Sequence, residues 1–293
     1  MPPKAAPQSA STSASSASSS LKHQSVGQQL TKLATSQQFY WYLGHVFALL
    51  FTVFSAITGL IYRKQSSLKY YRFALLSIIT TYLIVLKQVY FKNTGLKNVT
   101  VARLLRDENV QYIILAAIFL VSSFISGDQV PAGLYSYAIF AVFHVLTYFQ
   151  NQLLPVLVPS LTTQQKLSSR IGAIINKFNQ PALYVAAAVE SSLIVTTGLE
   201  LILLPFAILL RWRSFGYAIS KIIVFVSVVV FNKLRYDNSQ FTKAIVNEMD
   251  KNQAGFVTRL NNPKVTLLYN NLRAKAIYFL QLIQLPKEVK KTQ

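Results

Sequence analysis

A run of 24 residues, from position 39 to position 62, contains no Asp, Glu, Lys or Arg. As a helix rising about 1.5 Å per residue, such a run is longer than the roughly 30 Å hydrocarbon core of a bilayer. Five further apolar stretches follow it, at 70–91, 110–126, 130–150, 181–210 and 214–231. The pattern predicts an all-α, polytopic helical membrane protein.

The number of spans stays open between four and six, because two of these stretches are ambiguous. Only 14 residues separate Arg72 from Lys87 in the second stretch. Either these two side chains extend to opposite interfaces, or the segment inserts shallowly. The fifth stretch is either one tilted helix or a re-entrant pair.

The chain carries 29 basic and 9 acidic residues, a formal net charge of +20. In a chain embedded in a membrane, this excess favours anionic lipid headgroups over nucleic acid as the partner. The chain has no cysteine. Disulfides, thiolate metal ligands and lipidated cysteines are therefore excluded.

Basic residues also predict the orientation, because they concentrate in the cytosolic flanks of membrane spans. With six spans, this distribution places both termini in the cytosol. The exception is the group Arg63, Lys64, Lys69 and Arg72 between the first two spans. Either that hairpin is shallow and both of its ends stay cytosolic, or the charge rule is overruled there.

Composition divides the chain into three parts. Residues 1–36 are predicted to be a disordered cytosolic tail, since residues 9–20 consist of eight Ser, three Ala and one Thr. Residues 37–231 form the predicted transmembrane helical domain. Residues 232–293 form a basic cytosolic region with 11 basic and 4 acidic residues, which we expect to contain amphipathic helices lying on the membrane.

One helix in this basic region is predicted to start with Asn262 as N-cap and Pro263 at its first position. At 100° per residue, apolar side chains form a stripe along it. The predicted membrane-binding residues are Val265, Leu268, Leu272, Phe279 and Ile283 of the stripe, with Lys264, Arg273 and Lys275 flanking it. Such cations contribute on the order of 1 kcal/mol each near an anionic surface. Alternatively, since Leu267, Tyr278 and Leu282 lie off the stripe, the helix packs on the transmembrane bundle.

Four polar side chains within the spans are candidate functional residues: His144, Glu190, Glu200 and Lys221. The two glutamates are about 15 Å apart on one helix, so they cannot form a catalytic pair. We expect Lys221 to pair with one of them, and His144 to be an interior histidine rather than a metal ligand. The alternative is a small transporter or channel that uses Glu190, Glu200 and His144. No motif indicates an enzyme or a cofactor.

Short segments in a fixed order resemble the transmembrane protein 33 family. They are Ala102-Arg103-Leu104-Leu105 leading to Glu108, His144-Val-Leu-Thr147-Tyr148, Glu200-Leu-Ile-Leu-Leu-Pro205, Leu234-Arg235-Tyr236 and Asn247-Glu248-Met249. The resemblance covers residues 39–285 and excludes the serine-rich leader.

The resemblance implies a non-enzymatic protein of the endoplasmic reticulum and nuclear envelope that supports nuclear pore assembly or distribution and tubular organisation. It also implies reticulon-type membrane-shaping proteins, nucleoporins and an importin-β-type receptor as partners. The apolar spans and cationic amphipathic tail are independently compatible with curvature sensing. For the importin partner, the tail offers the basic residues Lys287, Lys290 and Lys291.

Overall fold

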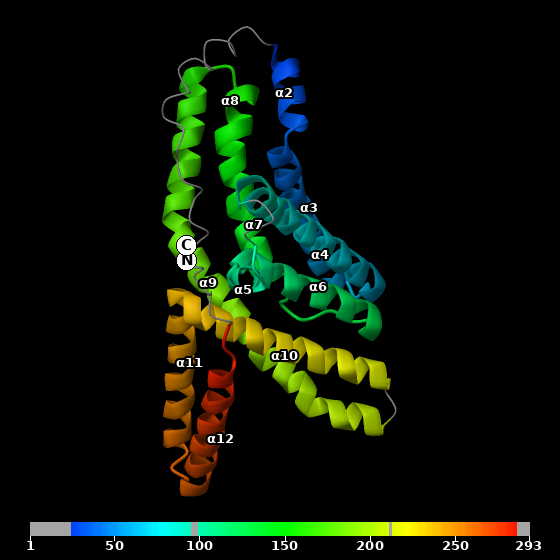
Figure 1. The fold of residues 1–293 in the computed structure, drawn as a ribbon, viewed down its shortest axis with the longest axis vertical. Helices are drawn as coiled ribbons and strands as arrows, with labels where there is room; N and C mark the ends of the chain where they lie inside the picture. The colour runs from blue at the N-terminus through cyan, green and yellow to red at the C-terminus, as the bar shows by residue number, and fades with distance from the viewer. Residues whose placement is uncertain (1–24, 95–98, 211–212, 286–293) are drawn as a thin grey trace. The chain divides into compact units, whose positions relative to one another are not determined.

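The computed structural model describes residues 25–94, 99–210 and 213–285, and these residues contain helices and connecting turns but no strand. The chain forms two compact units, Met1–Ile84 with Tyr137–Leu183, and Val85–Ser136 with Tyr184–Gln293. Figure 1 shows the helices along the chain.

The first unit begins with a short helix, α2 (Val26–Ala34), in a segment predicted to be disordered. Ser25 caps this helix, because its hydroxyl accepts from the amide of Gln28 while the Gln28 side chain accepts from the Ser25 amide. The helix packs on α8 (Leu154–Leu157) and on the start of α3. The predicted disorder of residues 1–36 is therefore wrong for 26–34, and the serine-rich run at 9–20 lies outside the described residues.

Helices α3 (Gln37–Leu60) and α4 (Lys64–Leu86) form an antiparallel hairpin. Ser55 Oγ donates to the Ser67 carbonyl at 2.9 Å, and Ser67 Oγ donates to the Ser55 carbonyl at 2.7 Å. Small residues such as Gly44 lie in the same seam. Small side chains let two membrane helices approach closely. After α4 the chain continues as a π-helical segment, η1 (Lys87–Thr94).

The stretch predicted as the fourth span forms α7 (Tyr135–Tyr148), followed directly by η3 (Phe149–Leu153) and α8. With 14 residues, α7 alone is about 21 Å long. It is shorter than a hydrocarbon core, but η3 and α8 continue the helical path without a break. Gln150 Nε2 donates to the Ser168 carbonyl at 2.9 Å and thereby ties η3 to the next helix.

That next helix, α9 (Leu161–Leu209), is continuous over 49 residues. The fifth predicted span is therefore part of one helix and not a re-entrant pair. A helix of this length measures about 74 Å, more than twice the hydrocarbon thickness. Its first part carries Lys166, Arg170 and Lys177, and the apolar stretch expected to span the membrane begins after them, at residue 181.

The second unit contains α5 (Val101–Arg106), α6 (Glu108–Ser126), α10 (Phe215–Asn238) and the second half of α9. Helices α6 and α10 run antiparallel along their whole length. Tyr112 of α6 packs edge-on against Phe231 of α10 at 5.1 Å between ring centroids, and Gly216 lies beside Ile125 at the other end.

Five helical segments are long and apolar enough to cross a membrane: Gln37–Leu60, Lys64–Tyr90, Glu108–Ser126, Leu161–Leu209 and Phe215–Asn238. The predicted all-α polytopic architecture is confirmed, and five lies within the expected range. The described chain ends in an antiparallel pair, α11 (Gln240–Arg259) and α12 (Pro263–Leu282), which lie side by side in Figure 1.

Candidate membrane-binding surface

The first turn of α12 forms as its sequence predicts. The Asn262 side chain accepts hydrogen bonds from the amides of Lys264 and Val265, at 3.0 and 3.4 Å, and Pro263 occupies the first helical position. Two otherwise unpaired amides are thus satisfied, and proline removes a third. The helix is therefore fixed at its start by local chemistry.

The predicted apolar stripe is divided in the structure. Val265 and Ile283 are half-buried, on the side of α12 that also carries Tyr269. Ile283 is the C-cap residue rather than a helical one. Leu268, Leu272 and Phe279 instead remain exposed. Of the predicted apolar residues, only this second group is exposed.

The exposed group is part of a wider surface, which we call the outer face of α12. It consists of six large apolar side chains that are each between 58% and 64% exposed: Leu267, Leu268, Leu272, Tyr278, Phe279 and Leu282. On a helical projection they cover an arc of about 140°. The exposed Lys264 and Lys275 fall within that arc. The face is therefore apolar, cationic and uncovered in the structure.

Arg273, predicted to contact headgroups, forms an ion pair with α11. Its Nε and Nη2 donate to the two carboxylate oxygens of Asp250, both at 2.6 Å, and the Tyr269 hydroxyl donates to Asp250 at 3.3 Å. The Arg273 hydrogen bonds hold the pKa of Asp250 below its ordinary value. This ion pair fixes which side of α12 faces α11, and so which side faces outward.

Three segments of the second unit match the thickness of a bilayer: α6, residues 190–209 of α9 and residues 215–235 of α10. Each is about 28 to 32 Å long. A polar cluster joins the same end of all three. Arg235 lies 2.9 Å from a carboxylate oxygen of Glu108 and 3.6 Å from one of Glu190, and the Tyr112 hydroxyl donates to Glu190 at 2.6 Å. The Glu190 side chain in this cluster is fully enclosed by protein.

Lys221 and Glu200 lie deeper within these spans. The Lys221 Nζ is 2.9 Å from a Glu200 carboxylate oxygen, so the expected ion pair forms with Glu200. The lysine side chain is 2% exposed and that of the glutamate 29%. Glu190 and Glu200 are each paired with a different cation, Arg235 and Lys221.

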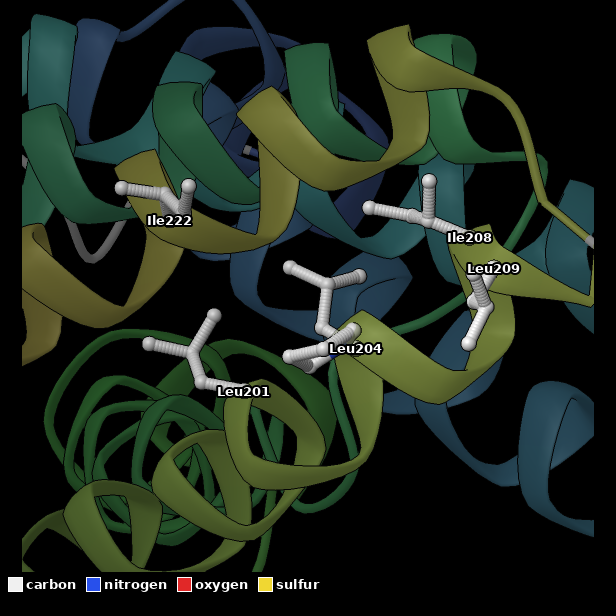
Figure 2. A pocket seen from close by; sticks show the side chains of 6 residues that line it. Leu201, Leu204, Ile208, Leu209 and Ile222 are labelled. Carbon is white, nitrogen blue, oxygen red and sulfur yellow. The ribbon is translucent and has the colours of Figure 1, made fainter.

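An apolar groove of about 540 Å³ lies beside this ion pair, between α9 and α10. Figure 2 shows its walls, formed by one row of side chains on α9 and by Ile222 on α10. The lining residues are Leu201, Leu204, Pro205, Ile208, Leu209 and Ile222. A wholly apolar lining without convergent polar groups offers shape but no chemistry for catalysis.

His144 lies in the first unit, packed against a second histidine. The ring centroids of His45 and His144 are 4.7 Å apart, and Trp41 contacts both rings edge-on. The two histidines are 99 positions apart in the sequence, so motif spacing gave no sign of this pair. Within the part of the chain that the structure describes, no group of three His, Cys, Asp or Glu side chains is placed to hold a metal ion.

Residues 18–283 match the family described as Transmembrane protein 33/Nucleoporin POM33. This match begins before residue 39, where the resemblance over residues 39–285 was predicted to start.

The chain is 35% identical to "Pore and endoplasmic reticulum protein of 33 kDa" of Saccharomyces cerevisiae, over 80% of this chain and 87% of that protein. It is 30% identical to "Tetra-spanning protein 1" of Schizosaccharomyces pombe, over 75% of each chain. It is also 31% identical to "Nucleoporin POM33" of Chaetomium thermophilum, over 61% of this chain and 67% of that protein. No solved structure matches the chain.

Proposed function

Because the chain belongs to the Transmembrane protein 33/Nucleoporin POM33 family, we propose that it is a non-enzymatic membrane-shaping and scaffold protein of the endoplasmic reticulum and nuclear envelope. Its spans anchor the chain in the bilayer. Its α11–α12 hairpin binds the same membrane from the cytosolic side and favours curved regions. In this way it supports nuclear pore assembly or distribution and the organisation of tubular membrane.

The outer face of α12 is the observation that carries this proposal. Six large apolar side chains and two lysines share one side of a helix that has no buried residue. Apolar side chains enter gaps between lipid headgroups, which are more frequent where a membrane is strongly curved, and lysines bind the anionic surface. A surface with both properties combines membrane affinity with a preference for curvature.

The partners are proposed from the relatives. One relative is named as a protein of the pore and endoplasmic reticulum and another as a nucleoporin, so nucleoporins are the first partners to test. Reticulon-type proteins and an importin-β-type receptor follow from the family resemblance. Lys287, Lys290 and Lys291, the basic residues considered for the receptor, lie outside the described residues.

The topology is also a proposal. The basic flanks place both termini in the cytosol. The name of the fission yeast relative, "Tetra-spanning protein 1", indicates four spans in that protein. A chain with both termini in the cytosol must cross the membrane an even number of times. Four spans meet this requirement.

Binding of a fragment of residues 232–293 to liposomes tests the function. Vesicles of about 30 nm and about 400 nm diameter are compared at matched anionic lipid content and at two salt concentrations. We expect tighter binding to the small vesicles, and this preference should persist at the higher salt, because apolar insertion is not screened. Absent binding, or binding that salt removes equally from both vesicle sizes, would overturn the proposed curvature role.

A further inference from the structure

The apolar groove between α9 and α10 has about the depth of a single leaflet. Its lining extends along α9 from Leu201 to Leu209, and Figure 2 shows these side chains following one another along the helix. The eight positions between them correspond to about 12 Å along the helix axis. One leaflet of a hydrocarbon core of roughly 30 Å is about 15 Å deep. The groove therefore suits a chain that extends through one leaflet.

The groove offers no polar group along its length. The residues of α9 from 201 to 209 are all apolar, and α10 contributes Ile222. The ion pair between Lys221 and Glu200 lies at one end of the groove, since these residues directly precede Ile222 and Leu201 in the chain. A polar ligand group placed along the lining would lose its hydration without gaining a hydrogen bond. The part of a ligand that fits here is therefore an uncharged hydrocarbon chain.

The other end of the groove lies at the connection between α9 and α10, where Arg213 is exposed. The Arg213 amide donates to the Ala207 carbonyl at 3.3 Å. The backbone of Arg213 thus lies beside the last turn of α9, which contributes Ile208 and Leu209 to the groove. The guanidinium carbon of Arg213 lies 4.7 Å from the centroid of the Tyr217 ring, in the first turn of α10. These two contacts keep the cation at the outer end of the groove.

Arg213 is available to an anion from outside the protein. In the described part of the chain, no carboxylate forms an ion pair with it. Arginine binds phosphate through paired N–H donors, and such charge-assisted hydrogen bonds are stronger than neutral ones. The groove thus combines an apolar lining of leaflet depth with a phosphate-binding group at its outer end.

A phospholipid carries the complementary pattern, with an anionic phosphate at the membrane surface and an uncharged acyl chain that extends through one leaflet. We propose that the groove between α9 and α10 binds one acyl chain of a phospholipid, whose phosphate is held by Arg213. The ligand is recognised by its phosphate and its chain, two features that all phospholipids share. This site differs from general contact with the bilayer because it has a defined cation and holds one molecule.

Two adjacent residues of α10 provide a matched comparison. Ile222 is 47% exposed and Ile223 is 49% exposed. Ile222 lines the proposed site, whereas Ile223 lines a smaller groove of about 200 Å³ between α6 and α10. Tryptophan at either position adds the same bulk to an equally exposed surface. Only Ile222→Trp places that bulk in the proposed site.

Photo-crosslinking of the purified full chain in detergent micelles tests the site. The probe is phosphatidylcholine with a diazirine on one acyl chain, and the crosslinked residues are mapped by mass spectrometry. We expect crosslinks at Leu204, Ile208 and Ile222 that saturate at one lipid per chain. Crosslinks spread without saturation over exposed residues outside the groove, such as Ile202 and Phe206, would show general lipid contact only and would overturn the proposal.

Competition with unlabelled lipids tests the phosphate. Diacylglycerol with the same acyl chains lacks the phosphate and should compete at least about tenfold more weakly than phosphatidylcholine. Arg213→Gln should weaken phosphatidylcholine by a similar factor and leave competition by diacylglycerol unchanged. If the two lipids compete equally with the unmodified chain, Arg213 does not recognise the phosphate and the proposal is wrong.

The tryptophan variants test the groove itself. Ile222→Trp should abolish the saturable crosslinks, and Ile223→Trp should retain them. Equal effects of the two variants would contradict binding in this groove. If Ile222→Trp instead changes the oligomeric state and leaves the crosslinks in place, the groove receives a second copy of the chain and not a lipid.

This site is separate from the proposed function of α12. The fragment 232–293 contains neither α9 nor the groove, so its binding to liposomes does not depend on the phospholipid site. Failure of the crosslinking test would therefore leave the proposed membrane role of α12 intact, and failure of the liposome test would leave this site intact.

Discussion

Replacing Leu272 and Phe279 by Glu should detach the C-terminal region from membranes. These side chains are 58% and 63% exposed in the structure, so about three fifths of each remains available for burial in lipid. Fully burying a large apolar side chain contributes about 1.5–3 kcal/mol, so each exposed portion is worth about 1–2 kcal/mol. The pair therefore contributes about 2–4 kcal/mol, which corresponds to a loss of affinity between about 30-fold and several hundred-fold.

The assay is partitioning of the 232–293 fragment onto small anionic vesicles by sedimentation or fluorescence titration. The matched control is Asn270→Glu with Gln281→Glu, which adds the same charge at exposed positions outside the outer face. We expect the control to lose only the electrostatic part of the affinity, and that part should shrink at higher salt. If both double variants lose the same affinity, the apolar face is not the binding surface and the reasoning is refuted.

Three further predictions concern charged groups. Glu200→Gln leaves the Lys221 ammonium without its partner inside a span and should lower the unfolding free energy by about 3 kcal/mol. Adding Lys221→Met should restore most of this free energy. If the second substitution restores nothing, the pairing is contradicted. Arg235→Gln removes the cation shared by two carboxylates and should cost about 3–5 kcal/mol in the same unfolding assay; an unchanged stability would contradict a shared cation. The hydrogen bonds from Arg273 lower the pKa of Asp250. The stabilising contribution of Asp250 is therefore present at neutral pH and is lost as the pH falls below 3.8, the ordinary pKa of an aspartate. The protection of α12 amides against exchange, measured relative to an unstructured peptide at the same pH, should therefore fall in acid, and Asp250→Asn should remove that fall.

Local chemistry was sufficient to predict several of the helices and some of their ends. The charge-free run from position 39 forms α3, and Asn262 with Pro263 begins α12. A cap or an apolar run depends on neighbours within a few residues, so both can be recognised in the sequence. The capping box at Ser25 had the same kind of signal, but the serine-rich composition just before it directed the prediction towards disorder.

The covered side of a helix was harder to predict, because periodicity does not say which neighbour packs on it. The apolar stripe of α12 was assigned as one surface, whereas the Arg273–Asp250 ion pair turns Val265 inward and leaves Leu267 exposed. That ion pair joins residues of two different helices. Only the three-dimensional arrangement shows which face remains free.

Contacts between distant segments could not be predicted either, because the sequence pattern does not show which segments pack together. The packing of His45 on His144 joins helices far apart in the sequence. The cluster around Arg235 gathers three helices, although Arg235 and Glu108 were noted only in resemblance motifs and Glu190 only as an isolated polar position. Tyr112 was not noted. In contrast, the pairing of Lys221 with a glutamate could be expected, since a lone charge within a span requires a partner.

The most direct test of the account is the environment of α12 in the full-length protein in anionic proteoliposomes. A polarity-sensitive fluorophore is attached to a single cysteine introduced at Leu268, on the outer face, or at Asn270, outside it. We predict that lipids with nitroxide-labelled acyl chains quench the fluorophore at position 268 and not at position 270. Equal, water-like emission at both positions without quenching would contradict the proposal that this face binds the membrane.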